Sequence, residues 1–497
     1  MQVYLMFKDK KFDYKESLPS YVEDLIIDLG LDIIFSKASE GDEFIQEVIK
    51  HGILQSLNDI QTIIYRQEVL KDCINNKDTI KAIYEISLEA IKKEKESLFG
   101  IFVKHPDSIV YSSRQVLEDF FAILEKLKNI FIENESRFKS EGFRQLFYRI
   151  KTKLSDEYLN KVDSVLKKLR FENGISINAK LSMLGKPSFF QVMHTKKDKQ
   201  SLIKSIFKQK NSYKIYIPEQ DEGGFRALSE IKNNTLNNIA NTLANTVYHL
   251  LDFFNQLRVE IAFYLACTKI YEKLLDITSV CFPEIYPQDK RMLAFFELSE
   301  PSLALVKESK VVVNSLEANQ KNIVLITGAN MGGKTTFLRS IAIACLFSQC
   351  GMFVAAKSFK YSLSSGIFTH FKKQEDKTLK NSKFDEELNR LSNIVDFLKP
   401  HSIVFFNETF SSTNDHEASI IAKYITESLI EKQIRVFFVT HLYEFAYLID
   451  NLDNSIFLKA QRNKDGTRTF KIVESKPEPK SYSEDLFKKI FNKEVIL

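Results

Sequence analysis

A chain of 497 residues is too long for one ordinary hydrophobic core, so we expect roughly two to four domains. Its residues are 44% hydrophobic and 27% charged, which is the balance of a folded protein, and the 15 Gly and 10 Pro are too few for a collagen-like or Pro/Gly-rich disordered chain. The 70 Lys and Arg exceed the 65 Asp and Glu by five, an excess that permits nucleic-acid binding but does not by itself indicate it.

The cysteines and the apolar runs indicate the compartment. The five cysteines include no CxxC pair, which argues against a disulfide framework or a zinc site and fits a reducing cytoplasm. The N-terminal sequence MQVYLMFKDKKFDYKES carries charges where a signal peptide needs an apolar run. Because no apolar stretch is long enough to span a bilayer, we expect a soluble, cytoplasmic protein with no membrane segment.

The first half of the chain is predicted to be mainly helical. Over residues 17–170, apolar residues recur at three- and four-residue steps with few Gly or Pro between them. Residues 172–193 alternate more and contain Gly and Pro, which predicts short strands and turns, and a basic stretch then leads to a turn predicted at Gly223-Gly224. Residues 225–277 are helical again. The simplest topology is a helical arm, a small β-containing tip and a returning arm, with two consecutive helical bundles and a β insertion as the alternative.

The predicted fold class changes from all-α to α/β near residue 286, where apolar runs begin to alternate with amphipathic helices. The runs that predict buried parallel strands are residues 323–326, 403–406 and 436–439. We therefore expect a helical domain over residues 1–285, with an insertion at about 172–226, and an α/β domain over residues 286–497.

The strongest motif follows the first of these strands and opens a helix. It consists of Gly328, Ala329, Asn330, Met331, Gly332, Gly333, Lys334 and Thr335. This is the spacing of a Walker A loop, whose backbone N–H groups and helix N-terminus bind phosphates. Lys334 would reach the β- and γ-phosphates and the Thr335 hydroxyl would coordinate Mg²⁺, so ATP and Mg²⁺ are the expected cofactors.

Two further strands end in residues that suit nucleotide hydrolysis. The run SIVFF ends in Asn407 and Glu408, where a Walker B motif has two carboxylates. Glu408 is the candidate general base, whereas the amide of Asn407 brings no negative charge to Mg²⁺ and predicts weaker metal affinity. The run VFFVT ends in His441, at the place of a γ-phosphate sensor. A single His is more often structural, but its position after a second buried strand favours function.

Together these motifs resemble the MutS family of DNA mismatch-repair ATPases. TGANMGGKTTFLRS resembles the family's TGPNMGGKST-[YF]-LR, with Ala329 in place of proline and Thr336 at the second threonine. GMFVAA resembles the G-x-[FY]-V-P-A strand, and FFVTHLYEF resembles F-A-T-H-[YF]-x-E-L, which makes His441 the histidine-loop residue. Upstream, Arg66 and Gln67 resemble an Arg-Gln-x-x-[VL] segment of the family's helical core.

The resemblance also implies a site shared between two subunits. NSKFDEE resembles the family's signature segment S-x-F-x-x-E, so Ser382 is expected to reach the γ-phosphate held by a partner subunit. Asn330 is expected to contact the γ-phosphate within its own subunit, and Thr413 matches the D-loop threonine. Catalysis is then expected from Glu408, His441 and Lys334.

The fold and function that the resemblance implies are specific. It implies an all-α core and lever domain with a small β-containing clamp tip, followed by an α/β ABC-type P-loop ATPase domain, in a homodimer that binds DNA. The family's mismatch-reading domain and an Smr nuclease domain have no counterpart in the sequence, and Asn407 replaces the Walker B aspartate. We therefore expect a slowed ATPase that recognises DNA structure, such as junctions, and not mismatches.

The expected tip is rich in lysine, and the candidate nucleic-acid contacts are Lys196, Lys197, Lys199, Lys204, Lys208 and Lys210. Lysines bind phosphates without regard to sequence, although a lysine-rich loop is more commonly a solvated surface. DNA binding would place the protein on the nucleoid. Two alternatives stay open: a ribosome-associated ATPase acting on stalled or collided ribosomes, and a weakly hydrolysing scaffold gated by nucleotide.

Overall fold

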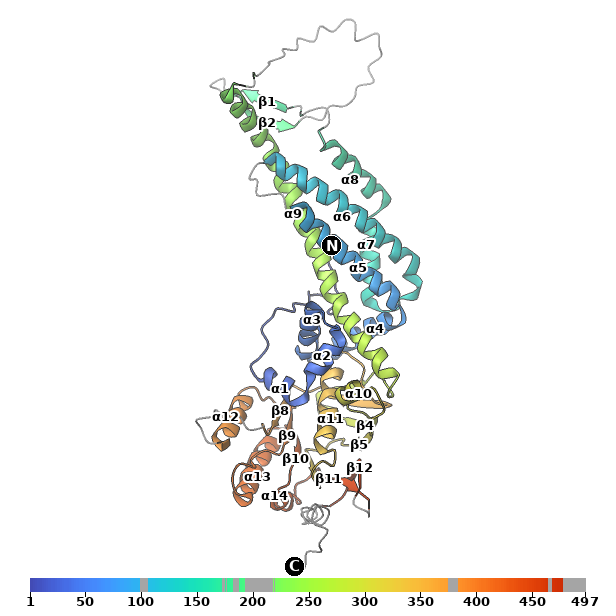
Figure 1. Cartoon of the computed structure of the whole chain (residues 1–497), viewed down its shortest axis with the longest axis vertical. Helices are drawn as coiled ribbons and strands as arrows, with labels where there is room; N and C mark the ends of the chain where they lie inside the picture. Colours follow the sequence, from blue (N-terminus) through green and yellow to red (C-terminus); the bar gives the residue numbers. More distant parts are fainter. Residues whose placement is uncertain are drawn as a thin grey trace, which may run out of the picture. The chain divides into compact units, whose positions relative to one another are not determined.

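The structure is a computed structural model, and its contacts divide the chain into two units (Figure 1). The described residues are 1–98, 106–171, 175, 177–181, 187–192, 218, 220–373, 383–463 and 467–476. The first unit comprises residues 1–3, 81–136 and 144–258, and the second comprises residues 4–80, 137–143 and 259–497. The predicted domain boundary near residue 286 remains a prediction.

The first unit is built from helices and one hairpin. Its elements are most of α5 (Lys77–Leu98), α6 (Pro106–Asn134), most of η1 (Glu135–Arg137), most of α7 (Glu141–Lys153), α8 (Asp156–Lys168), and the greater part of α9 (Glu222–Leu275). Aromatic rings pack between these helices. The ring centroids of Phe120 on α6 and Phe254 on α9 lie 5.4 Å apart, and Phe131 of α6 stacks on Phe147 of α7 with 4.3 Å between centroids. Such ring pairs add to the hydrophobic burial that holds the helices together.

The hairpin and the start of α9 test the sequence predictions between residues 172 and 226. The short strands predicted there are present as β1 (Ile177–Leu181) and β2 (Pro187–Val192), which pair antiparallel. The turn predicted at Gly223-Gly224 is wrong, because both glycines lie in the first turn of α9. The carboxylate of Asp221 accepts a hydrogen bond from the backbone N–H of Gly224 at 2.9 Å, and this N-terminal cap allows the helix to start before the glycines.

The second unit contains a six-stranded sheet in the order β12-β11-β6-β10-β9-β8, parallel except for the edge strand β12. Its strands are β6 (Ile323–Thr327), β8 (Ile367–Phe371), β9 (Ile403–Asn407), β10 (Arg435–Val439), β11 (Ser455–Arg462) and β12 (Arg468–Glu474). The three buried parallel strands predicted from apolar runs are confirmed as β6, β9 and β10. Cross-strand ring pairs, such as Phe405 stacked on Phe437 at 4.9 Å, hold β9 and β10 in register.

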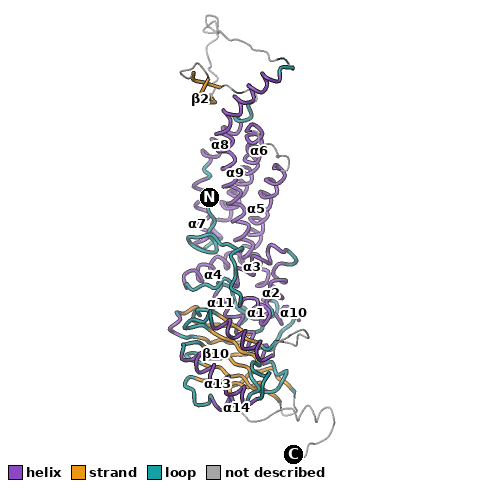
Figure 2. The backbone as a smooth tube through the Cα atoms, turned by 90° about the vertical axis from the view of Figure 1, so that its left-hand side faces the viewer, coloured by secondary structure: helices purple, strands orange, loops and turns teal. Residues whose placement is uncertain are grey.

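Helices cover both faces of this sheet. The helices that lie wholly within the unit are α1 (Tyr21–Leu29), α2 (Leu31–Ser39), α3 (Glu43–Leu54), α4 (Ile60–Asn75), α10 (Pro301–Lys307), α11 (Lys334–Gln349), α12 (Lys383–Val395), α13 (Asp415–Glu431), α14 (Tyr443–Leu448) and the short η2 (Gln288–Lys290). Alternate residues of β6, β9 and β10 form one core with α12, α13 and α14, and Figures 1 and 2 show α11 on the other side of the strands. Parallel strands buried on both faces need apolar side chains throughout, as this sequence has.

A smaller mixed sheet lies in the same unit. Its order is β3-β7-β4-β5, with strands β3 (Glu284–Tyr286), β4 (Leu293–Leu298), β5 (Asn314–Glu317) and β7 (Ser358–Ser362). Residues 351–356, which resemble a strand of the MutS family, form only a single bridge from Val354 to Cys281. Among the described residues, no helix is long and apolar enough to cross a membrane.

Two motifs that are far apart in the sequence meet at Arg66. This residue of α4 is fully buried, and its guanidinium donates to the carbonyl oxygens of Met6 at 2.9 Å and Cys350 at 3.4 Å. The chain turns directly after α11 at Gly351, with φ of 84°, and a Cβ there would lie 2.6 Å from the Arg66 Cβ. The arginine thus connects the N-terminal segment to the end of α11, and it requires glycine at position 351.

Gly351→Ala is expected to lower the free energy of unfolding by about 2 to 4 kcal/mol, from the positive φ and from the clash with Arg66. Gly41→Ala is the matched control, since Gly41 also has a positive φ, of 92°, but a Cβ there would meet nothing within 4 Å. The control should cost only about 1 kcal/mol, for the backbone strain alone. Urea unfolding measures both variants, and equal losses would contradict the clash.

Candidate functional site

The site begins where β6 ends and α11 starts. The connecting loop has three residues with positive φ, namely Gly328 at 114°, Met331 at 59° and Gly333 at 91°. Gly332 needs to be glycine for a different reason, because a Cβ there would lie 2.8 Å from the Cβ of Ala460 on β11. The loop is therefore packed closely on the neighbouring strand and leads directly into the N-terminus of α11, where free backbone N–H groups favour anions.

Lys334 is the first residue of α11 and is only 4% exposed. Its Nζ donates to the carbonyl oxygens of Gly328 at 2.9 Å and Ala329 at 3.0 Å, and it lies 3.4 Å from Nε2 of His441. Burial lowers the pKa of Lys334 to about 8, against a partly opposing effect of the Glu408 carboxylate. A cation that is poorly compensated by protein groups is a strong attractor for a phosphate.

Glu408 and His441 are brought together by the pairing of β9 with β10. Asn407 lies opposite Val439 in the parallel ladder, so the residues that follow the two strands emerge at the same edge of the sheet. Nε2 of His441 lies 3.0 Å from Oε1 of Glu408. This hydrogen bond is the largest cause of the lowered pKa of Glu408, so the carboxylate stays ionised and is held in one orientation.

Asn407 faces the start of α11. Its Oδ1 accepts a hydrogen bond from the hydroxyl of Thr335 at 3.0 Å. Hydroxyl and amide oxygens, with the Glu408 carboxylate directly after Asn407, are the hard donors that Mg²⁺ prefers, and Mg²⁺ commonly takes only one or two protein ligands beside substrate phosphates. The residues present therefore fit a magnesium ion that is shared with a nucleotide.

A pocket of about 370 Å³ extends from the loop and Lys334 along α11. Its other walls come from β4, α10, β5, β12 and the residues that connect β4 to β5. The side chains that form them are Leu298, Glu300, Leu303, Lys307, Lys310, Val311, Val312, Asn314 and Phe470. A pocket with apolar and basic side chains beside a phosphate-binding loop is suited to bind the base and sugar of a nucleotide. Sequence reasoning missed these residues, since they carry no motif and come from separate segments.

The structure brings most of the predicted residues together. Lys334, Thr335, Asn407, Glu408 and His441 form one connected set. Asn330 is exposed and lies outside the pocket lining, whereas Thr336 of α11 lines the pocket. Thr413 bonds to Glu417 at 2.8 Å. Ser382 and the candidate nucleic-acid lysines between 196 and 210 lie outside the described residues.

Comparison with known families gives two matches along the chain. The MutS2 N-terminal domain matches residues 58–277, and MutS domain V matches residues 324–496. The second range contains α11, β9, β10 and all but the first residue of β6. It therefore contains the whole connected set around Lys334.

Similar proteins carry related names. MutS protein homolog 4 of Mus musculus is 23% identical over 87% of this chain and 52% of its own length, and its Homo sapiens counterpart is 24% identical over 87% and 53%. The DNA mismatch repair protein MutS of Streptococcus equi subsp. equi is 34% identical over 33% of this chain and 20% of its own length. The chain thus spans about half the length of the two mammalian relatives, and less of the bacterial one.

The two family matches lie on either side of residue 286, and the C-terminal one coincides with a phosphate loop, a strand-end carboxylate and a strand-end histidine that meet in space. The chain belongs to the MutS family.

Proposed function

We propose that this chain binds ATP with Mg²⁺ and hydrolyses it at the site around Lys334. The observation that carries the proposal is the convergence of Lys334, Thr335, Asn407, Glu408 and His441 at the carboxyl edge of one parallel sheet. A buried lysine, two oxygen donors and an ionised carboxylate are what phosphoryl transfer to water requires.

Each residue has a role that follows from its place. Lys334 and the backbone N–H groups of the loop would hold the β- and γ-phosphates, and Thr335 and Asn407 would hold Mg²⁺ directly or through water. When bound, the metal neutralises the charge that develops on the phosphates. Glu408 would orient and deprotonate the attacking water, and His441, hydrogen-bonded to Glu408, would fix that carboxylate beside the γ-phosphate.

Asn407→Asp is expected to lower the Mg²⁺ concentration at half-maximal hydrolysis by about tenfold, because a carboxylate replaces a neutral amide beside Thr335. The added charge also compensates that of Lys334. A Mg²⁺ titration of steady-state ATP hydrolysis at fixed ATP checks this. An unchanged midpoint would show that Asn407 lies too far from the metal to matter.

We also propose that the chain acts on DNA as a dimer, with Ser382 completing the site of a partner subunit. The names of the bacterial relatives include DNA mismatch repair, and the resemblance of NSKFDEE to the family signature supports the shared site. The proposed substrate is branched or junction DNA, and Lys196, Lys197, Lys199, Lys204, Lys208 and Lys210 are proposed phosphate contacts on the sequence alone.

The DNA proposal is tested by fluorescence anisotropy with a four-way junction, a perfect duplex and a duplex with one mismatch, each with and without ATP. Tighter binding to the junction, with equal binding to the two duplexes and a steep dependence on salt, is the expected result. A strong preference for the mismatched duplex would overturn it.

Asn407 favours one alternative function, a nucleotide-gated scaffold that turns over slowly or not at all. Tight ATP binding without hydrolysis, in the presence of any DNA, would establish this alternative. Weak binding to every DNA, together with co-sedimentation with ribosomes at moderate salt, would establish the ribosome-associated role.

A further inference from the structure

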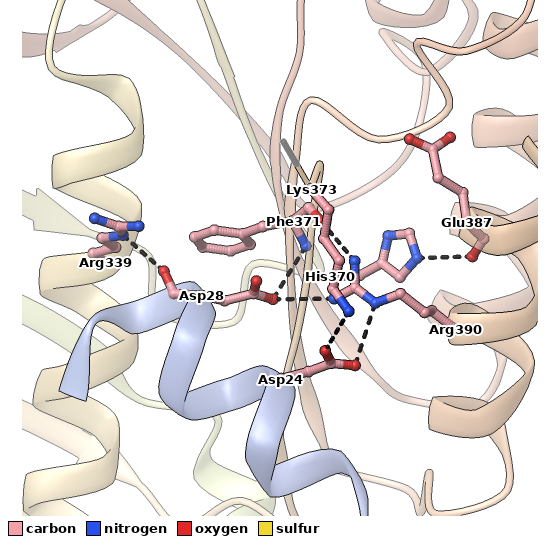
Figure 3. A network of polar contacts seen from close by, with 8 residues as sticks. All are labelled: Asp24, Asp28, Arg339, His370, Phe371, Lys373, Glu387 and Arg390. Carbon is pink, nitrogen blue, oxygen red and sulfur yellow. Dashed lines mark hydrogen bonds and ion pairs between the residues drawn. The ribbon is translucent and has the colours of Figure 1, made fainter. Parts of the chain in front are cut away.

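Helix α1 carries two carboxylates that point the same way, and it lies outside both matched ranges. Asp24 and Asp28 are one helical turn apart, so their side chains lie on one face, as Figure 3 shows. Asp28 is only 5% exposed, and burial raises the pKa of its carboxyl group. A buried carboxylate needs partners to offset its loss of hydration, and the partners here come from three other elements.

The first two partners belong to the end of β8 and to α12. Asp24 accepts from Nε of Arg390 at 3.2 Å and pairs with Nζ of Lys373 at 3.1 Å. Asp28 accepts from the backbone N–H of Phe371 at 3.3 Å and from Nη2 of Arg390 at 3.5 Å. Arg390 itself donates through Nη1 to the carbonyl oxygen of Phe371 at 2.8 Å. One guanidinium thus connects α1, β8 and α12 (Figure 3).

The third partner belongs to the phosphate-loop helix. Arg339 of α11 donates through Nε to the backbone carbonyl of Asp28 at 2.7 Å. The residue whose carboxylate contacts β8 and α12 is therefore also bonded, through its main chain, to the helix that begins with Lys334. A short hydrogen bond to a charged donor is among the stronger polar contacts in proteins.

The end of β8, where Phe371 lies, also packs on the loop that follows Glu408. His370, next to Phe371 on β8, bonds through Nε2 to the carbonyl oxygen of Glu387 on α12 at 2.9 Å. Burial lowers the pKa of His370 to about 4, so the ring is neutral and Nε2 is the donor in this bond. Its ring stacks on Phe410 with 6.1 Å between centroids, and Phe410 comes two residues after Glu408.

We propose that Asp24, Asp28 and Arg390, together the α1 brace, are positioning residues that fix the end of β8 and the start of α12 relative to the phosphate-loop helix. Because His370 lies next to Phe371 and stacks on Phe410, the brace would set where Phe410, and with it Glu408, lies relative to Lys334. The inference rests on the proposed function.

Asp28→Asn is the most informative substitution, because it keeps the shape of the side chain while Arg390 keeps Asp24 as a partner. The turnover number for ATP should fall roughly tenfold or more, since a small displacement of a positioned group is costly, while the Kd for ATP changes by less than about twofold. Glu23→Gln, on the exposed side of α1, is the matched control and should change neither value.

Arg390→Lys provides a second variant that retains the charge. A lysine cannot bridge two carboxylates and the Phe371 carbonyl at once, so turnover should fall as in Asp28→Asn. Urea unfolding midpoints close to that of the wild type show that the losses come from the site and not from the fold.

Unimpaired turnover by Asp28→Asn would overturn the inference and leave the proposed ATPase standing. A wild-type chain without turnover would remove the proposed function and this inference together.

Discussion

Glu408→Gln is expected to reduce ATP turnover by roughly 100- to 10,000-fold, which is the usual contribution of a general base to the rate. The carboxylate follows β9, and His441 holds it through a 3.0 Å hydrogen bond that also keeps it ionised. Glutamine has nearly the same shape and can keep the contact with His441, but it cannot accept a proton from water. ATP binding should therefore persist, so the variant separates binding from chemistry.

The chain provides its own control for this substitution. Glu47 pairs with His51 at 3.8 Å in a second Glu–His contact, which lies on α3 and outside the proposed site. Glu47→Gln makes the same chemical change and should leave turnover unaltered. Steady-state hydrolysis and the Kd of a fluorescent ATP analogue measure both effects. If Glu408→Gln hydrolysed ATP at the wild-type rate, the base would have to be another group.

Lys334→Ala is expected to weaken ATP binding by about 100-fold or more, because charge-assisted hydrogen bonds to phosphate oxygens are lost. Lys334 is almost fully buried at the start of α11. Lys357→Ala, which removes a lysine over the ring of Phe296 on β4, is the control and should bind ATP normally. Equal affinities for the two variants would place the phosphates elsewhere.

The pKa of Lys334, lowered to about 8, also predicts how pH acts. Between about pH 8 and the ordinary lysine pKa of 10.5, the unfolded chain holds this proton more tightly than the folded chain, so the lysine's contribution to the free energy of unfolding rises with pH. Phosphates favour the protonated lysine, so nucleotide binding should take up protons, and more of them near pH 9 than near pH 7. Calorimetry in buffers of different ionisation enthalpy measures this uptake, and a constant uptake would contradict it.

The sequence predicts those parts of the structure that depend on local pattern. The phosphate loop, the strands that end at Asn407 and Val439, and the long helix after residue 225 are present because each has a contiguous signature. The carboxyl edge of a parallel sheet then brings strand-end residues together, so the meeting of Glu408 with His441 was also predictable.

Other features depend on contacts between distant segments. Glu300, Asn314 and Phe470 form the pocket wall without a motif, and Asp28 meets Arg390 across most of the second unit's sequence. The error at Gly223-Gly224 has a local cause, since two glycines weaken a helix but the Asp221 cap offsets part of their cost. Such interactions appear only when side chains are placed in space.

The most direct test of the proposed ATPase is steady-state ATP hydrolysis by the purified chain as protein concentration is raised, with and without four-way junction DNA and with Glu408→Gln as the background. Turnover per chain should rise with concentration, because two subunits complete each site in the proposed dimer, and junction DNA should change it further. Turnover no greater than the Glu408→Gln background at every concentration, despite tight ATP binding, would contradict hydrolysis at Glu408 and leave a nucleotide-gated scaffold.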